Sequence, residues 1–234
     1  MKRTTENTFS IIICAKNEEQ YIDKKITNSL KIQGNIIEII VVDDNSQDQT
    51  AKITKKWQEK NIRIKYIKNK QEKGKIGALR TGVKSAQGRW LILTDCDTTL
   101  DLQVITKIEE LLADNKLWIV GLQAKNRTWE WTVIENCRLK LWPTWLTRGQ
   151  FMLVRNKKEL FEEFDYVDDV EIAWKAIKLK KKVLVDKNSY FVDNFAAGWN
   201  FYRQIWRRSL FLDKAIYNNI GFLLNNNYFS NSQI

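Results

Sequence analysis

Short apolar runs alternate with longer amphipathic segments along the first 95 residues of the chain. Runs rich in β-branched residues predict strands at 9–14, 36–42, 62–67 and 89–94. Apolar positions at helical spacing predict helices at 18–32, 46–60 and 77–87. Strands that are apolar at every position are typical of parallel sheets covered on both faces. We therefore expect an α/β fold with a Rossmann-like, mostly parallel central sheet flanked by helices.

The second half of the chain has a less regular pattern. Further strands are predicted at 117–122, 150–154 and 182–186. Amphipathic helices are predicted at 101–115, 168–180 and 199–217, and a polar tail follows. No linker divides the chain, so we expect one domain.

A pair of carboxylates follows the apolar run LILT. Asp95 and Asp97 flank Cys96 at the expected carboxyl end of this strand. Placing charge beside a buried strand is costly unless something neutralises the charge, which favours a divalent cation or a ligand that brings one. The chain has no histidine, so a metal would be held by oxygen ligands, as Mg²⁺ and Mn²⁺ prefer. A hydrated surface turn is the alternative.

A second acidic turn, Asp43-Asp44-Asn45-Ser46, follows the strand at 36–42. Ligands of such sheets bind at the carboxyl ends of the strands, where these carboxylates can accept hydrogen bonds from a base or a ribose. Capping of the next helix by Ser46 or Asp48 is the alternative, and the two roles are compatible.

The segment GKIGALRTG (74–82) opens a helix after a basic loop. Gly74 and Gly77 permit close backbone approach, Lys75 and Arg80 supply cations, and a helix N-terminus favours phosphate. The glycine spacing is neither that of a P-loop nor that of the dinucleotide fingerprint. An ordinary glycine-rich turn is the alternative.

Four motifs together resemble the nucleotide-binding half of family-2 glycosyltransferases, which have the GT-A fold. In order along the chain they are CAKNEE, VVDDNSQDQT, GKIGALRTG and ILTDCD, and both their order and their spacing carry the resemblance. The resemblance covers about residues 8–100. It implies that Asp97, assisted by Asp95, holds Mn²⁺ or Mg²⁺. It also implies a nucleotide-sugar site made of Ala15, Asn17, Glu18, Asp43, Asp44, Lys75, Gly77, Arg80, Asp95, Cys96 and Asp97.

The second half can be compared with the same family. DYVDDVEIAWKAI (165–177) resembles the acidic motif at the head of a helix, which makes Asp169 the general base; simple N-capping by this residue or Asp168 is the alternative. TRGQFMLVRNKKEL (147–160) resembles the acceptor side. Gln204, Arg207 and Arg208 partly match a Q-x-x-R-W motif that contacts the acceptor or the diphosphate. The family's frequent histidine after the last core strand is absent near FVDN (191–194).

The resemblance implies a single catalytic GT-A domain over 1–234. About 8–100 would bind the nucleotide sugar, about 101–198 would hold the base and the acceptor, and about 199–234 would form the helix and tail. The implied reaction is an inverting, metal-dependent single displacement from a UDP- or GDP-sugar to an acceptor hydroxyl. The acceptor would be a lipid-linked or glycan precursor.

Charge adds a question about partners. The chain carries 39 Lys and Arg against 28 Asp and Glu, a net charge of +11, which suits an anionic partner or only a solvated lysine surface. Aromatic and basic residues at 199–217 fit a membrane interface or a core. With no signal peptide and no long apolar run, we expect a cytoplasmic protein, with the inner face of the membrane as a place of contact. The isolated Cys14, Cys96 and Cys137 predict neither zinc nor disulfides.

Two other functions fit parts of this pattern. A sugar nucleotidyltransferase shares acidic metal ligands, but it usually has a glycine-rich basic loop after the first strand, where this chain has CAKNEE. A nucleic-acid-binding protein would fit the net charge and the aromatics of 199–217. The acidic strand ends would repel a nucleic-acid backbone, so we expect no nucleic acid as partner.

Overall fold

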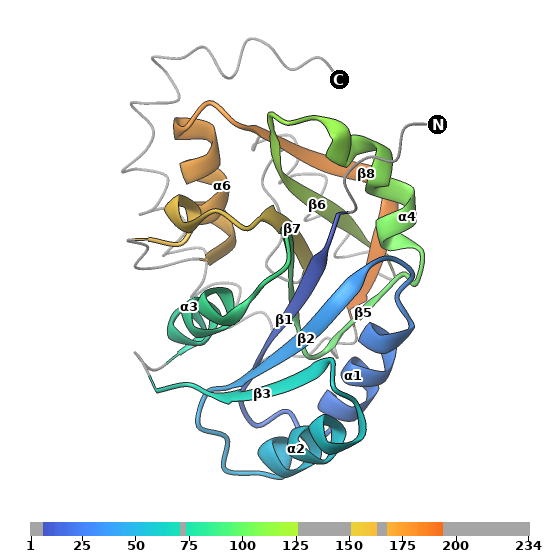
Figure 1. Ribbon diagram of the computed structural model, residues 1–234, viewed down its shortest axis with the longest axis vertical. Helices are drawn as coiled ribbons and strands as arrows, with labels where there is room; N and C mark the ends of the chain where they lie inside the picture. The colour runs from blue at the N-terminus through green and yellow to red at the C-terminus, as the bar shows by residue number, and fades with distance from the viewer. Residues whose placement is uncertain (1–6, 71–73, 126–150, 163–167, 194–234) are drawn as a thin grey trace, which may run out of the picture.

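The computed structural model describes residues 7–70, 74–125, 151–162 and 168–193 of the 234-residue chain. Its centre is a mixed sheet of eight strands in the order β3-β2-β1-β4-β7-β6-β8-β5. Helices cover both faces of the sheet, α1, α2 and α4 on one side and α3 and α6 on the other (Figure 1). The predicted α/β architecture is confirmed.

The first half of the sheet is fully parallel, as the apolar runs predicted. Its strands are β1 (Phe9–Ala15), β2 (Ile36–Asp43), β3 (Ile64–Lys68) and β4 (Trp90–Asp95). The helices between them are α1 (Ile22–Lys31), α2 (Thr50–Lys60) and α3 (Lys75–Ser85). Each strand–helix–strand unit therefore returns the chain to the same end of the sheet.

The second half adds antiparallel strands. β7 lies between β4 and β6 and is antiparallel to both, whereas β8 is parallel to β6, and β5 is antiparallel to β8. The strands are β5 (Thr98–Leu100), β6 (Leu117–Lys125), β7 (Phe151–Arg155) and β8 (Lys182–Asp193). The helices are α4 (Val104–Ile108), a 3₁₀-helix at Glu109–Ala113, another at Lys158–Leu160, and α6 (Asp168–Lys178).

Several predicted boundaries were wrong. The helix expected at 101–115 is a short α-helix followed by a 3₁₀ turn, the strand expected at 182–186 continues to Asp193, and the short β5 was not predicted. The helix expected at 46–60 begins at Thr50 because Ser46 and Asp48 belong to the preceding loop. The predicted helix at 199–217 and the tail lie outside the described residues. Within the described part of the chain, no helix has the length and apolarity to cross a membrane.

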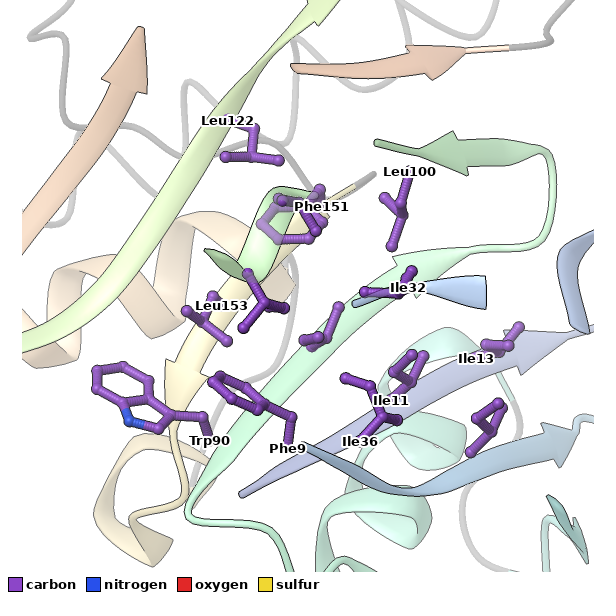
Figure 2. Close-up of a cluster of buried hydrophobic side chains, with 14 of the residues drawn as sticks. Phe9, Ile11, Ile13, Ile32, Ile36, Trp90, Leu100, Leu122, Phe151 and Leu153 are labelled. Carbon is purple, nitrogen blue, oxygen red and sulfur yellow. The ribbon is translucent and has the colours of Figure 1, made fainter. Parts of the chain in front are cut away.

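Alternate side chains of each strand build two cores. Ile11 and Ile13 of β1 pack with α1 and α4, whereas Ile12 packs with α3 and α6 on the opposite face. Figure 2 shows the larger cluster, in which Phe9 and Trp90 lie beside Leu153 of the antiparallel strand β7. The core thus runs continuously across both halves of the sheet and fixes the strand ends relative to one another.

Candidate functional site

The carboxyl ends of the parallel strands lie side by side, and they form the edge of the sheet at which the candidate site lies. Ala15 of β1 pairs with Asp43 of β2, and Cys14 pairs with Asp95 of β4. Because the pairing is parallel, the loops after these strands leave from the same edge. Most of the predicted nucleotide-sugar residues lie on these loops or at the start of α3, so the structure brings the two acidic motifs and the GKIG segment together.

The loops after β1 and β2 are joined by hydrogen bonds. The Asn17 N–H donates to Ser46 Oγ (3.0 Å), and Gln47 N–H donates to Asn17 Oδ1 (2.8 Å). The Glu18 N–H donates to Thr50 Oγ1 (2.8 Å). Asn17 has φ of 56°, a left-handed conformation that asparagine tolerates well. Ser46 therefore links the two loops instead of capping α2, and Asn17 shapes the wall of the site.

Asp43 is buried at the carboxyl end of β2, with 2% of its surface exposed. Its Oδ1 accepts a hydrogen bond from Ser46 N–H (2.9 Å), and its Oδ2 accepts one from the Tyr66 hydroxyl (2.9 Å). Burial, together with this hydrogen bond to Asp43, raises the pKa of Tyr66 to about 12. The phenol therefore stays protonated, and can donate its hydrogen bond to the carboxylate, to a higher pH than an ordinary tyrosine.

Asp44 ties three loops to the start of α3. Its Oδ1 accepts a hydrogen bond from Asn69 Nδ2 (2.9 Å), and its Oδ2 accepts from Gly74 N–H (3.0 Å) and Lys16 Nζ (3.4 Å). Burial alone would raise the pKa of Asp44, but these hydrogen bonds outweigh it and lower the pKa. Gly74 has φ of 106°, which few other residues adopt. Asp44 therefore serves the architecture of the site.

An ion pair joins α3 to the end of β4. Lys75 Nζ lies 2.9 Å from Asp95 Oδ1, and both side chains are partly exposed. Burial, followed by the charges of Asp97, Asp95 and Asp48, raises the pKa of Glu18 to about 7. The charges of Asp95 and Asp97 thus reach the Glu18 carboxyl, and a cation at this point would oppose their effect.

The donor atoms at this edge fit a hard divalent cation. Asp95 and Asp97 offer carboxylate oxygens, the ligands that Mg²⁺ and Mn²⁺ prefer. Among the described residues, no three His, Cys, Asp or Glu side chains are grouped closely enough to hold a metal. A cation bound by the two aspartates would therefore need further oxygens from a bound ligand or from water.

The side chains of some predicted residues at this edge are buried. The Cys96 side chain is 5% exposed and belongs to the main core cluster, and burial raises the pKa of its thiol. Ala15 is also buried in that cluster. Gly77 is buried within α3, and Arg80 lies one turn further along that helix. Gln204, Arg207 and Arg208 lie outside the described residues.

The predicted base, Asp169, is the second residue of α6. β6 and β8 run in the same direction as β4, because both intervening pairings with β7 are antiparallel. α6 packs on β6 and β8 and reaches β8 through a short turn, so it runs back against them. Its first turn therefore lies toward the end of the sheet where β4 reaches Asp95. The role of Asp169 stays a prediction.

Lys25, Tyr66 and Asn69 are among the residues of this region that were not predicted. Asn69 directly follows β3, which is the same strand-end signal that identified Asp43 and Asp95. Tyr66 lies in β3, whose alternating pattern gave no reason to single it out. Lys25 interrupts the apolar face of α1, between Ile22 and Ile26, and only burial distinguishes it from the chain's many surface lysines.

Comparison with known proteins adds sequence relatives. The model of the family described as Glycosyl transferase family 2 matches residues 10–166. An uncharacterized glycosyltransferase of Haemophilus influenzae is 35% identical over 106 residues, which cover 45% of this chain and 33% of that protein. The human dolichyl-phosphate β-glucosyltransferase is 30% identical over 119 residues, covering 47% of this chain and 37% of that one. The chain thus spans about a third of the length of these relatives.

Solved structures share the fold. A mannosyltransferase from Pyrobaculum calidifontis, in complex with GDP-mannose and Mn²⁺, has a TM-score of 0.68 at 20% identity, covering 86% of this chain and 61% of that one. Glucosyl-3-phosphoglycerate synthase from Mycobacterium tuberculosis, in complex with Mn²⁺ and UDP, has a TM-score of 0.65 at 18% identity. The match covers 89% of this chain and 79% of that one. These likenesses confirm the predicted GT-A fold.

Proposed function

Because the chain belongs to the family-2 glycosyltransferases, we propose that it transfers a sugar from a nucleotide-diphosphate sugar to an acceptor hydroxyl. The reaction is a metal-dependent single displacement that inverts the anomeric carbon. The observation that carries this proposal is the ion pair of Lys75 with Asp95 at the carboxyl end of β4, two residues before Asp97, where the charges of both aspartates also act on Glu18. This arrangement combines oxygen ligands for a cation with a lysine for phosphate.

Asp97, with Asp95, would hold Mn²⁺ or Mg²⁺, which would neutralise the diphosphate as it leaves. Lys75 pairs with Asp95 in the free protein, and a bound diphosphate offers its ammonium a second anionic partner. The Lys75 ammonium can then stabilise the negative charge that develops on the leaving diphosphate.

The proton of the acceptor hydroxyl goes to Asp169 in this proposal. The acceptor oxygen attacks the anomeric carbon while the bond from that carbon to the diphosphate oxygen breaks. One base and one displacement give inversion of configuration. The position of α6 supports this role, because its first turn lies toward the edge that carries Asp95.

A UDP- or GDP-sugar as donor and a lipid-linked or glycan precursor as acceptor complete the proposal. Structural relatives hold GDP-mannose and UDP, and the human relative is named for a dolichyl-phosphate acceptor. A lipid-linked acceptor would place the protein at the inner face of a membrane, with 199–217 as the contact. Incubation with polyprenyl phosphate and each nucleotide sugar, followed by extraction into organic solvent, tests this acceptor class.

The donor site is tested by calorimetric titration of UDP and GDP, with Mn²⁺ and with chelator. We expect one nucleotide to bind only with the metal, and Asp97→Asn to abolish that binding. Asp114→Asn is the matched control because Asp114 precedes β6 at the opposite end of the sheet and pairs with Lys182. Metal-independent binding, or equal losses in both variants, would contradict the proposal.

The base is tested by comparing Asp169→Asn with Asp168→Asn, its neighbour in the first turn of α6. Loss of a general base typically lowers the rate by about 10²–10⁴. We expect that loss of kcat in Asp169→Asn alone, with nucleotide affinity unchanged in both variants. If both variants turn over at the wild-type rate, Asp169 has no role in proton transfer.

A further inference from the structure

Lys25 is a lysine inside the core of the protein. It lies in α1 between Ile22 and Ile26, and only 2% of its surface is exposed. Lysine side chains are rarely buried to this degree, because removing the ammonium from water is costly. A buried ammonium therefore needs partners close by, and the partners of Lys25 lie at the candidate site.

The Lys25 ammonium makes two short hydrogen bonds. Nζ donates to Thr94 Oγ1 at 2.7 Å and to the Thr98 carbonyl oxygen at 2.6 Å. Thr94 precedes Asp95 in β4, and Thr98 is the first residue of β5, directly after Asp97. One ammonium thus holds both ends of the Asp95-Cys96-Asp97 turn from the core side.

Charge also links Lys25 to this turn. Burial lowers the pKa of Lys25 to about 8, while the nearby Cys96, Asp95 and Asp97 act in the opposite direction. The ammonium is therefore mostly charged at neutral pH, within reach of the charges of two carboxylates. An apolar side chain of similar length would fill the same space without the cost of burying a charge. In this protein the two hydrogen bonds and the nearby carboxylates offset part of that cost.

We propose that Lys25 is a positioning residue, whose two hydrogen bonds hold the Asp95–Asp97 turn in the conformation that receives the cation and diphosphate of the donor. This inference rests on the proposed function for its ligand, but the ordering of the turn can be measured without any ligand. The turn then needs no rearrangement on binding, so its carboxylates meet the cation without an ordering cost.

A neighbouring residue offers a matched control. Asn28, one turn further along α1, donates from Nδ2 to the Leu100 carbonyl oxygen (3.0 Å) and accepts from Leu100 N–H (2.9 Å). Asn28→Ala therefore also removes two hydrogen bonds from α1 to β5. It leaves Lys25, Thr94 and the turn intact, so it reports on lost stability alone.

The first measurement is the affinity for UDP or GDP, whichever wild type binds, in the presence of Mn²⁺. We expect Lys25→Met to weaken the nucleotide affinity at least about tenfold. The affinity of Asn28→Ala should stay within about twofold of wild type, because this site is independent of the turn. Affinity in Lys25→Met equal to or tighter than wild type would overturn the proposal, because the turn would then receive the donor without the two hydrogen bonds. If Lys25→Met does not fold, Thr94→Val removes one acceptor of the ammonium and is expected to weaken binding in the same direction.

The second measurement is amide hydrogen exchange of residues 96–98 in the ligand-free protein. We expect faster exchange there in Lys25→Met, or in Thr94→Val, than in Asn28→Ala. Unchanged exchange would overturn the proposal even if the variants bind nucleotide poorly. If wild type binds no nucleotide, the proposed function fails, and this exchange experiment alone decides whether Lys25 orders the turn.

Discussion

Replacing Asp44 by alanine should destabilise the protein much more than removing its exposed ion-pair partner. The change removes the Asp44 acceptor from two donors: Asn69 Nδ2, in a side chain that is 3% exposed, and the Gly74 N–H, which is only partly buried. Losing the acceptor of a buried donor costs about 1–3 kcal/mol, and the loss at the buried Asn69 should exceed that at the partly buried Gly74. The expected loss in the free energy of unfolding is therefore about 2–4 kcal/mol.

Urea denaturation of Asp44→Ala and Lys16→Ala measures this difference. Lys16 is 59% exposed and lies 3.4 Å from Asp44, so its removal should cost less than about 1 kcal/mol. The midpoint should shift in Asp44→Ala with the slope unchanged, because the unfolded surface is the same. Equal midpoints in the two variants would refute the reasoning, and would mean that water satisfies Asn69 and Gly74 when the carboxylate is gone.

Three further predictions concern pH and packing. Burial lowers the Lys25 pKa from 10.5 to about 8, so between pH 8 and 10.5 the unfolded chain binds more protons than the folded protein. In urea titrations the free energy of unfolding of wild type should therefore rise by about 3 kcal/mol relative to Lys25→Met across this pH range. The Glu18 pKa is raised from 4.5 to about 7, so the folded protein binds more protons there, and wild type should lose stability relative to Glu18→Gln as pH rises from 4.5 to 7. A Cβ at Gly82 would lie 2.6 Å from Ile12 Cγ2, so Gly82→Ala should lower the free energy of unfolding by about 1–3 kcal/mol, seen as a lower melting temperature.

The sequence predicted the sheet edge of the site because its signals there are local. An apolar run marks each strand, and the polar residue that ends the run marks the place where a parallel strand stops, as at Asp43 and Asp95. The partners of those carboxylates come from other loops, so no local pattern shows that Asp44 is bound by Asn69 and Gly74.

Two other features depend on contacts between distant segments. The insertion of β7 between β4 and β6 is set by long-range pairing, and the three residues of β5 are too few to show a period. Lys25 stands at helical spacing from Ile22 on the apolar face of α1, but the partners that hold its ammonium come from β4 and β5, which no local pattern shows. The identity of the longer elements was therefore predictable, whereas the short β5, the order of the antiparallel strands and the partners of Lys25 were not.

The position of β7 has a consequence for the chain during its synthesis. β1 to β4 are complete once residue 95 has been made, but the partner of β4 on its other side begins only at Phe151. At roughly 5–20 residues per second, several seconds pass between the two. During that time the nascent protein presents the apolar strand Trp90–Asp95 as an open edge, which is a template for pairing with other chains. The yield of folded protein in the cell should therefore depend on chaperones that cover this strand until β7 arrives.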